Sequence, residues 1–335
     1  MSNVEASPRE VDCAGAPADS GVQIHPPRDV PLGGPRAMTV RRTLPQRSRS
    51  LIGAWCFVDH YGPDDVARTG GMVVPPHPHT GLQTVSWLFT GEIEHRDSTG
   101  AHAMVRPGEL NLMTAGRGIA HSEVSTANVS TLHGVQLWLA LPEAARSTEP
   151  RFDRYVPEPV SGPGWELRVF LGELAGSASP VHTHSRVLGA ELVLEPGTVL
   201  DLEADPRFEY GLLADTSDLV FQDSAVAAGE LAYLPPAQTT LRIAAPGNTA
   251  VRAMVIGGEP LGETIVMWWN FIGRTHEDII RYRRDWQQHI GAELSPGGAH
   301  GRAGRDTPRF AAVPRDPLPP LPAPVLPNAR LRPRS

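Results

Sequence analysis

Short apolar runs separated by Gly, Pro and Asp turn residues dominate the middle of this chain. Several of these runs are rich in β-branched or aromatic residues or alternate apolar with polar positions, at 84–90, 109–113, 133–141, 166–174 and 188–196. Runs of this length and spacing are typical of antiparallel sandwiches and barrels, in which the strands are short and half-buried. The sequence therefore predicts an all-β fold.

A short internal match indicates that the β-rich region contains two similar halves. RPGELNLMTAG at 106–116 and AAGELAYLPPA at 227–237 each place Gly-Glu-Leu before an apolar pair and a turn. A chain of 335 residues is long enough for two domains of ordinary size. We therefore expect two double-sheet jelly rolls in tandem.

The two ends of the chain differ in composition from the middle. Residues 1–20 are mostly small or polar, and 291–335 is rich in Pro, Arg, Gly and Ala with few large apolar side chains. Segments of this kind bury too little apolar surface to offset the entropy lost on ordering. We expect residues 1–20 to be disordered and the tail to be disordered or polyproline-like.

The segment just before this tail changes to a helical period. From Thr275 onward, Ile279, Tyr282 and Trp286 recur on one side of a helix, and Thr275 is a suitable N-cap. The pattern predicts an amphipathic helix that docks on a barrel.

Charge and targeting features limit the classes of function. The chain has 37 acidic residues against 30 basic ones, all of them Arg, and a net charge of −7. This balance disfavours binding to nucleic acid or to an anionic membrane. The first residues lack a secretion signal, no segment has a run of roughly 18 apolar residues, and Cys13 and Cys56 do not suggest a disulfide framework. We expect a cytoplasmic protein.

Two pairs of metal-ligand residue types lie in neighbouring parts of the chain. In extended backbone, residues i and i+2 project to the same face. VPPHPHTG therefore presents His77 and His79 together, and TAGRGIAHSEV presents His121 and Glu123 together after a Gly-rich turn. A lone H-x-H pair is often fortuitous, but the second pair in an all-β context indicates a site. Three imidazoles and one carboxylate suit a divalent ion such as Fe, Mn, Ni, Cu or Zn and leave coordination positions for water or substrate.

Other histidines are predicted to have different roles. His95, in GEIEHRDS, is expected beside the ligands rather than on the ion. His182 and His184 form another H-x-H pair, but no x-H-x-E pair follows it, which predicts exposed linker histidines and a second barrel without metal. The chain also lacks the G-x-S-x-G, P-loop, C-x-x-C and dinucleotide-binding motifs.

The long run HPHTGLQTVSWLFTGEIEHRDSTGAHAMVRPGELNLMTAGRGIAHSE at 77–123 resembles the pirin family of the cupin superfamily. WNFIGRTHEDI at 269–279 resembles the late Trp-Asn-Phe segment of that family, so the similarity spans roughly Arg41 to His289. The resemblance implies two tandem cupin domains, here at 21–160 and 161–290, with a short C-terminal helix in the second. It also implies one metal ion, usually iron, held by His77, His79, His121 and Glu123.

Two departures from the family pattern lie near these positions. Where H-P-H-R-G-F-E-T-V is common in the family, this chain has Thr80, Leu82 and Gln83; where Gln-Trp is common, it has Asn111 and Leu112. Gln83 replaces a carboxylate that could accept a hydrogen bond next to the ligands. We expect Gln83 beside the ligands, and the family's substrate does not transfer directly.

The resemblance implies quercetin 2,3-dioxygenase activity on a flavonol-type phenol with O2, with Fe(II) as the first choice of ion and Glu123 as acceptor of the hydroxyl proton. Two other functions stay open. One is a metal- or redox-sensing regulator that binds a protein partner, which the Pro-rich tail could contact through an aromatic groove. The other is a cupin whose metal is structural, or whose substrate is another small phenol or enediol.

Overall fold

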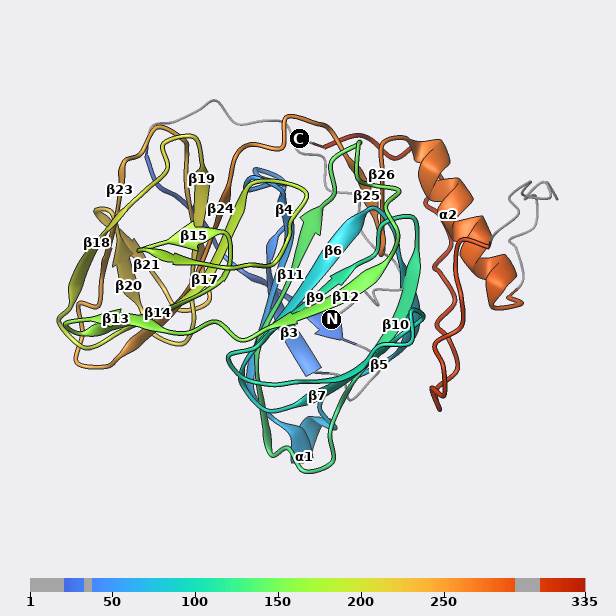
Figure 1. Cartoon of the computed structure of the whole chain (residues 1–335), viewed down its shortest axis with the longest axis horizontal. Helices are drawn as coiled ribbons and strands as arrows, with labels where there is room; N and C mark the ends of the chain where they lie inside the picture. The colour runs from blue at the N-terminus through green and yellow to red at the C-terminus, as the bar shows by residue number, and fades with distance from the viewer. Residues whose placement is uncertain (1–20, 33–37, 293–307, 335) are drawn as a thin grey trace.

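The computed structural model describes residues 21–32, 38–292 and 308–334, and shows two β-barrels side by side (Figure 1). Each barrel consists of a seven-stranded and a four-stranded antiparallel sheet. The all-β, two-cupin fold and the short C-terminal helix predicted from the sequence are confirmed. Two further sheets have only two short strands each and are described below with the elements they join.

The strands of the N-terminal barrel are arranged in two sheets. The larger sheet has the order β12 (Arg151–Tyr155), β9 (Leu110–Thr114), β6 (Leu82–Thr90), β11 (Thr131–Ala140), β4 (Trp55–Asp65), β3 (Met38–Leu44), β2 (Arg28–Leu32). The smaller sheet has the order β5 (Val73–His79), β10 (Ile119–Ser125), β7 (Ile93–Asp97), β8 (His102–Val105). A single-turn helix, α1 (Val66–Thr69), follows β4.

The C-terminal barrel repeats this arrangement. Its larger sheet has the order β1 (Gln23–His25), β22 (Leu231–Leu234), β19 (Glu209–Ala214), β24 (Val251–Gly258), β17 (Val187–Leu194), β14 (Trp165–Leu171), β13 (Val160–Gly162). Its smaller sheet has the order β18 (Val199–Glu203), β23 (Thr240–Ala244), β20 (Leu219–Phe221), β21 (Ser224–Val226). A short hairpin, β15 (Glu173–Leu174) and β16 (Ser177–Ala178), lies outside both sheets.

The internal sequence match falls on equivalent strands of the two barrels. β9 and β22 each occupy the second position in their larger sheet. Gly108 and Gly229 precede these strands with positive φ, and their N–H groups donate to Leu88 O and Ala214 O, in β6 and the equivalent β19. The short Gly-Glu-Leu match therefore marks a repeated turn whose backbone conformation favours glycine.

The domain boundaries differ from the expected 21–160 and 161–290 at both ends. β1 pairs with β22, so residues 23–25 complete the C-terminal barrel rather than the N-terminal one. In the other direction, β25 (Val266–Trp268), β26 (Phe271–Gly273) and α2 (His276–His289) pack on the N-terminal barrel, where Phe271 bridges to Thr80 of the β5–β6 turn. Each barrel is therefore completed by a segment from the other end of the chain.

Helix α2 begins as the sequence predicts. The Thr275 side chain accepts a hydrogen bond from the backbone N–H of Asp278, and the Asp278 carboxylate accepts one from the backbone N–H of Thr275, which forms a capping box. Ile279, Tyr282 and Trp286 are buried against β26. In Figure 1 the helix lies on the far side of the N-terminal barrel from the C-terminal barrel.

The expectation of a disordered C-terminal tail was wrong for the part that the structure describes. Residues 308–334 run along α2, with Phe310 and Leu331 buried in the same apolar cluster as Trp286. A Pro-rich segment offers few N–H groups for a sheet, but its carbonyls accept hydrogen bonds from Arg283 and Trp286 of the helix. The expected disorder at 1–20 and 293–307 lies outside the described residues.

The two barrels share an apolar core between their larger sheets. It contains large side chains from both, including Trp55 and Trp87 from the N-terminal barrel and Phe170 from the C-terminal one. Trp87 stacks on Phe170 with ring centroids 4.6 Å apart, and the Trp55 Nε1–H donates to Leu188 O and Gly257 O at 3.1 and 3.0 Å. The barrels are thus joined by both burial and specific hydrogen bonds.

A buried polar cluster also crosses this interface. Nε2 of His60 and Nε2 of His133 lie 2.8 and 2.6 Å from the same Oδ1 of Asp215, which belongs to the C-terminal barrel. Because a carboxylate only accepts hydrogen bonds, both rings carry a proton on Nε2. Arg41 then donates to Nδ1 of His60 at 3.1 Å, and Arg252 pairs with Asp215 at 3.3 Å. A neutral His60 satisfies every one of these contacts.

We predict that this cluster makes the protein less stable in mild acid. Burial lowers the pKa of His60 from 6.5, so its contribution to the free energy of unfolding is fully present above about pH 6.5 and is lost as the pH falls below that value. Urea unfolding of metal-free protein at pH 7.5 and pH 5 should show a larger loss of stability for the wild type than for His60→Gln. Equal losses in both proteins would contradict the prediction.

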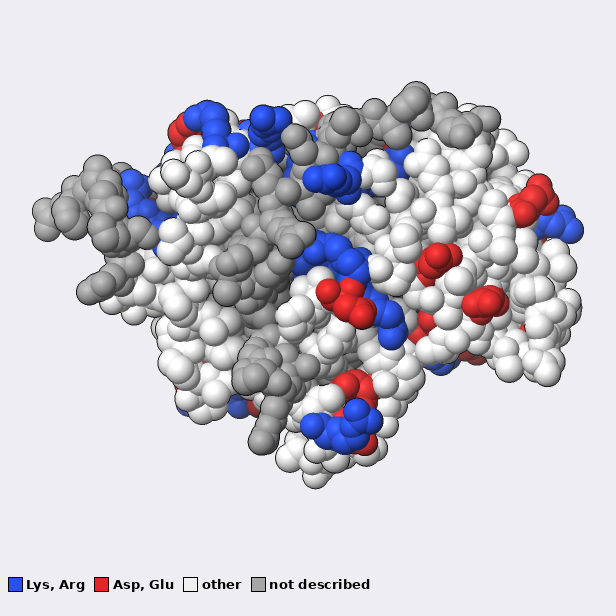
Figure 2. All heavy atoms as spheres, turned by 180° about the vertical axis from the view of Figure 1, so that it is seen from behind, with Lys and Arg blue, Asp and Glu red and all other residues white. Residues whose placement is uncertain are grey.

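None of the helices within the described residues is long and apolar enough to cross a membrane. On the face shown in Figure 2, Arg side chains lie in small groups with Asp or Glu beside most of them. Exposed Arg side chains are paired with carboxylates elsewhere too, as Arg186 is with Glu259 and Arg242 is with Asp201.

Candidate metal centre

The predicted ligands lie on two paired strands of the N-terminal barrel. β5 and β10 are antiparallel, with His77 opposite His121. Alternate residues of a strand point to the same side, and all four predicted side chains, His77, His79, His121 and Glu123, are at most 1% exposed. A β-bulge in β5 places Val74, rather than a residue two before His77, opposite Glu123, which re-aims the strand within the site.

The four predicted ligands and His95 form two overlapping groups. The nitrogens of His77, His79 and His121 lie within 4.8 Å of one another, and so do ligand atoms of His95, His121 and Glu123. Nε2 of His79 and Nε2 of His121 are 3.1 Å apart. Two nitrogens that each lie about 2.1 Å from one ion, at roughly a right angle, would be about 3 Å apart. This spacing fits a shared divalent ion.

The imidazoles of the site are held in the neutral form that a metal ion needs. Burial lowers the pKa of His77 to about 4, and burial also places the pKa values of His79 and His121 well below 6.5. The Nδ1–H of His77 donates to Pro75 O at 2.7 Å, which leaves the lone pair on Nε2. Hydrogen bonding of the outer nitrogen to a carbonyl is the usual way to orient a histidine ligand.

His95 lies beside His121, on β7, where it is opposite Glu123. Nδ1 of His95 is 3.4 Å from Nδ1 of His121, and Nε2 of His95 is 3.2 Å from Oδ2 of Asp97. One set of tautomers satisfies this chain: His121 donates to His95, and His95 donates to Asp97. The two nitrogens of His121 point to different sides of its ring, so an ion bound at its Nε2, next to His79, would leave its Nδ1 bonded to His95. His95 would then be a hydrogen-bond partner of a ligand.

Asp97 is itself fixed in place. Its Oδ1 accepts hydrogen bonds from the backbone N–H and hydroxyl of Thr99 at 2.8 and 2.6 Å. Burial would raise the pKa of Asp97, but these bonds and the one from His95 lower it overall. The sequence contained a signal for this residue: in EHRD, His95 and Asp97 are two apart in a strand, so they share a face.

Glu123 is oriented by the opposite sheet. The hydroxyl of Ser86 donates to Oε1 of Glu123 at 3.0 Å and lies 2.8 Å from the side-chain amide of Gln136. A hydroxyl has one proton, so the Gln136 amide must be turned to donate to Ser86. No other hydrogen bond to Nε2 of Gln136 exists among the described residues, which agrees with this orientation.

We predict that Ser86→Ala weakens metal affinity by about tenfold, because partners of metal ligands typically contribute 10–100-fold. Titration of metal-free protein with the metal ion, in the presence of a competing chelator, measures this change in affinity. Ser161→Ala, which removes an exposed hydroxyl from β13 of the other barrel, should bind metal as the wild type does. An affinity of Ser86→Ala equal to that of the wild type would show that the hydroxyl does not orient Glu123.

Gln83 does not lie beside the ligands, where the family pattern placed it. Its Nε2 donates to Thr114 Oγ1 at 2.9 Å. By the alternation of β6, Gln83 shares a face with Val85, which packs in the inter-barrel core, whereas Ser86 faces Glu123. The expectation of Gln83 beside the ligands was therefore wrong, because a change of residue type near a motif says nothing about strand face.

Aromatic side chains that the sequence did not single out enclose the site. Trp138 lies edge-on to His79, with centroids 5.1 Å apart, and stacks on Phe57 at 4.0 Å. Phe152 stacks on His95 at 4.4 Å. The backbone of Asn270, from the β25–β26 turn, hydrogen-bonds to His79. These contacts come from four separate segments, so their convergence depends on the fold.

The remaining histidine groups differ from this site. His182 is exposed and His184 is half-buried, and neither forms a group of three ligand-type side chains within the part of the chain that the structure describes. His60, His133 and Asp215 do have ligand spacing. However, Arg41 and Arg252 contact that cluster, and their charge opposes a cation.

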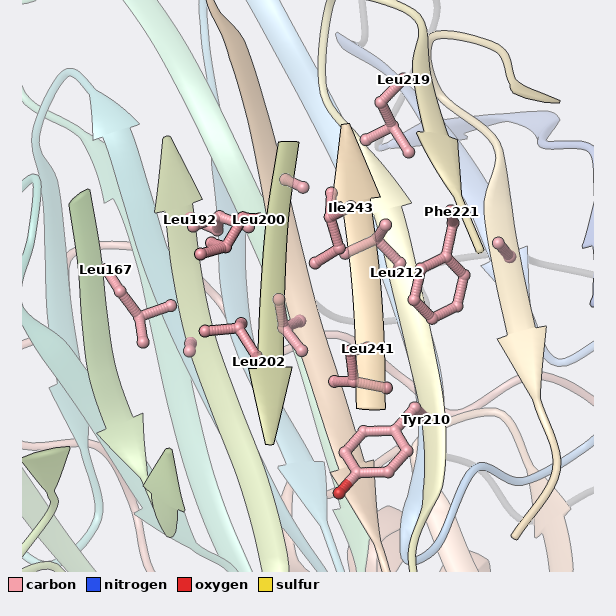
Figure 3. Close-up of a cluster of buried hydrophobic side chains, with 14 of the residues drawn as sticks. Leu167, Leu192, Leu200, Leu202, Tyr210, Leu212, Leu219, Phe221, Leu241 and Ile243 are labelled. Atoms are coloured by element: carbon pink, nitrogen blue, oxygen red, sulfur yellow. The ribbon is translucent and has the colours of Figure 1, made fainter. Parts of the chain in front are cut away.

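The C-terminal barrel has apolar side chains where the N-terminal one has ligands. β18 and β23 occupy the sheet positions of β5 and β10. Their inward residues are Leu200, Leu202, Leu241 and Ile243, which pack together in the core shown in Figure 3. An ion there would have no donor atoms.

Comparison with known proteins agrees with this architecture. The family model "Pirin" matches residues 37–139, and the model "Pirin C-terminal cupin domain" matches residues 189–290. A Pseudomonas aeruginosa protein provisionally named a quercetin 2,3-dioxygenase is 42% identical over 78% of this chain and 82% of its own length. A pirin-like protein of Caulobacter vibrioides is 33% identical over 74% of this chain and 88% of its own.

Solved structures show the same fold. A quercetin 2,3-dioxygenase from Acinetobacter baumannii superposes with a TM-score of 0.82 and 34% identity, over 92% of this chain and 96% of that one. The Escherichia coli pirin YhhW, solved in complex with nickel(II), has a TM-score of 0.54 and 17% identity over 72% of this chain and 100% of its own, which shows the fold alone. The chain belongs to the pirin family.

Proposed function

We propose that this protein is a metal-dependent dioxygenase that cleaves a flavonol-type phenol with O2, as quercetin 2,3-dioxygenases do. The observation that carries the proposal is the buried convergence of His77, His79, His121 and Glu123 inside one barrel. The similarity to a relative named for this activity and to a solved quercetin 2,3-dioxygenase supports it.

The donor set fits a divalent transition ion rather than Mg²⁺ or Ca²⁺, because imidazole nitrogens suit the former and oxygen ligands the latter. We propose His77, His79, His121 and Glu123 as the residues that would hold it, with Fe(II) as the first candidate and Mn, Ni, Cu or Zn as alternatives. A structural zinc site normally closes all four positions with Cys and His. A carboxylate in the set therefore favours a reactive site.

The chemistry divides between the ion and the chain. A bound ion would supply Lewis acidity that lowers the pKa of a phenolic hydroxyl. Glu123, held by Ser86 at 3.0 Å, would accept the hydroxyl proton. The buried ring of Trp138 would exclude water from the same space. In the overall reaction both atoms of O2 enter the product, and the carbon that carried the hydroxyl leaves as carbon monoxide.

The regulator considered from the sequence has less support. Its proposed contact was the Pro-rich tail, and residues 308–334 pack on their own chain. We therefore do not propose a partner surface there.

The test is turnover of quercetin by metal-reconstituted protein, with O2 uptake and carbon monoxide release measured together. We expect equal amounts of both gases, and a loss of at least about 100-fold in Glu123→Gln, because general acid–base groups contribute roughly 10²–10⁴-fold. Glu173→Gln, at an exposed position of the other barrel, should behave as the wild type. Uptake without carbon monoxide would contradict the proposed cleavage, and an active Glu123→Gln would remove Glu123 from the reaction.

A further inference from the structure

The tail, residues 308–334, contacts the outer side of both strands that carry the predicted ligands. In Figure 1 it is the dark red trace that runs beside α2. Strand alternation puts His121 and Glu123 on the inner face of β10 and leaves Ala120 and Ser122 on the outer face. Ala120 belongs to the apolar cluster that contains Phe310 and Leu331 of the tail.

The tail touches the Gly-rich turn that leads into β10. Nη1 of Arg309 donates to Arg117 O at 2.5 Å, and Nη1 of Arg117 donates to Pro308 O at 3.2 Å. A Cβ on Gly118 would lie 2.8 Å from Arg309 O. Glycine at this position therefore permits the close approach of the tail.

One tail side chain hydrogen-bonds to Ser122, the residue that lies between the predicted ligands His121 and Glu123 in the sequence. The hydroxyl of Ser122 donates to the carboxylate of Asp316. Asp316 is held in turn by the backbone N–H of Leu318, which donates to its Oδ1 at 2.9 Å. A hydrogen bond to a carboxylate is stronger than one between neutral groups, so this contact restrains β10 at its central residue.

The tail also covers the edge of β5. β5 is the edge strand of its sheet and contains Pro75, Pro76 and Pro78, which have no N–H to donate. The backbone N–H of Leu321 donates to Pro76 O at 2.8 Å, next to His77. The tail therefore satisfies an edge carbonyl in the middle of the ligand strand.

Helix α2 holds the tail against these strands. Nε1 of Trp286 donates to Leu321 O at 2.8 Å, Nε of Arg283 donates to Pro324 O at 2.5 Å, and Oε1 of Gln287 accepts from the Ala323 N–H at 2.8 Å. The carbonyl of Leu321 is thus bonded to the helix while its N–H is bonded to β5. One residue joins the two elements.

We infer that the tail is a positioning element of the metal centre: through Asp316 and Leu321 it fixes β10 and β5 in the register that brings the ligands together, and so slows loss of the ion. The inference rests on the proposed metal site. Asp316 and Leu321 act through Ser122 and Pro76 and touch neither ion nor substrate. Hydrogen-bonded outer groups of this kind typically change metal affinity by 10–100-fold.

Point variants test this inference, because deleting the tail would expose the apolar cluster around Trp286. Asp316→Ala removes the bond to β10 from a position 194 residues away in sequence. Arg330→Ala is the matched control, since it removes the tail's ion pair with Glu277 at the start of α2, away from β5 and β10. The readout is the rate at which metal-loaded protein loses its ion to excess chelator, with thermal unfolding of metal-free protein measured alongside.

We expect Asp316→Ala and Ser122→Ala each to lose the metal ion about tenfold faster than the wild type. The double variant should lose it no faster than either single variant, because the two residues share one hydrogen bond. Arg330→Ala should lose the ion at a rate within about twofold of the wild type. Equal rates in Asp316→Ala and Arg330→Ala would overturn the inference. If the wild type binds no ion, the proposed function fails, and hydrogen exchange of the 119–125 amides then decides: faster exchange in Asp316→Ala supports the positioning role, and unchanged exchange overturns it.

Discussion

His121→Ala should lose most of the metal that the wild type binds. His121 is the residue shared by both ligand groups of the site, and it also donates the hydrogen bond that engages His95. Loss of a direct ligand should exceed the 10–100-fold effect of losing an outer partner, so we expect affinity to fall by more than about 100-fold. Metal content after dialysis, by elemental analysis, measures the change.

The matched control for this variant is His184→Ala. His184 belongs to the other H-x-H pair and lies 5.0 Å, between ring centroids, from His182. It should keep the metal content of the wild type. Equal metal loss in His121→Ala and His184→Ala would contradict the assignment of a single site in the N-terminal barrel.

His95→Ala should lower turnover more than metal content, because His95 hydrogen-bonds to the outer nitrogen of the ligand His121 and is not itself a ligand.

Asp215→Ala should reduce the free energy of unfolding by about 3–5 kcal/mol, the range found when one partner of a buried charged pair is removed. Asp215 is 3% exposed and is the shared acceptor for His60, His133 and Arg252. Burial by itself would raise the pKa of this carboxyl, but the hydrogen bonds from both histidines lower it well below its usual range. Without Asp215, two buried N–H groups and a guanidinium lose their acceptor.

Urea unfolding at pH 7.5 measures this effect, and Asp201→Ala is the control. Asp201 pairs with Arg242 at 2.9 Å, but both side chains are about half exposed, and such surface pairs contribute only about 0–1 kcal/mol. A loss below about 1 kcal/mol in Asp215→Ala would show that the polar cluster does not stabilise the contact between the barrels.

The parts of the fold that depend on local pattern could be predicted from the sequence. Strands such as 84–90 and 133–141 have the β-branched and alternating residues that suit half-buried sheet, and they lie within β6 and largely within β11. Thr275 begins α2 because its side chain caps the first turn. The spacing of His77 with His79 and of His121 with Glu123 was enough to place each pair on one strand face.

The parts that depend on long-range contact could not be predicted in this way. β1 pairs with β22, more than two hundred residues later, and no periodicity of either segment specifies that partner. The tail has the composition of a disordered segment, yet it finds hydrogen-bond donors in Arg283 and Trp286, whose burial on α2 becomes evident only in the folded structure.

The candidate site shows the same division. Ser86, Trp138 and Phe152 come from segments with no motif of their own, and each acquires its role from a partner on another strand. Gln83 shows the opposite error, since its place next to a motif suggested a role that the alternation of β6 excludes. The two-residue spacing of His95 and Asp97 would have been enough to place both on one strand face, and the antiparallel pairing of β7 with β10 completes the placement.

The most direct test of the proposed metal centre is a crystal structure of the metal-reconstituted protein with anomalous data collected at the absorption edge of the ion. We predict one strong anomalous peak per chain, inside the N-terminal barrel, within about 2.0–2.2 Å of nitrogens of His77, His79 and His121 and of an oxygen of Glu123. A principal peak at His60, His133 and Asp215, or at His182 and His184, would contradict it, as would an ion bound by His95 in place of Glu123.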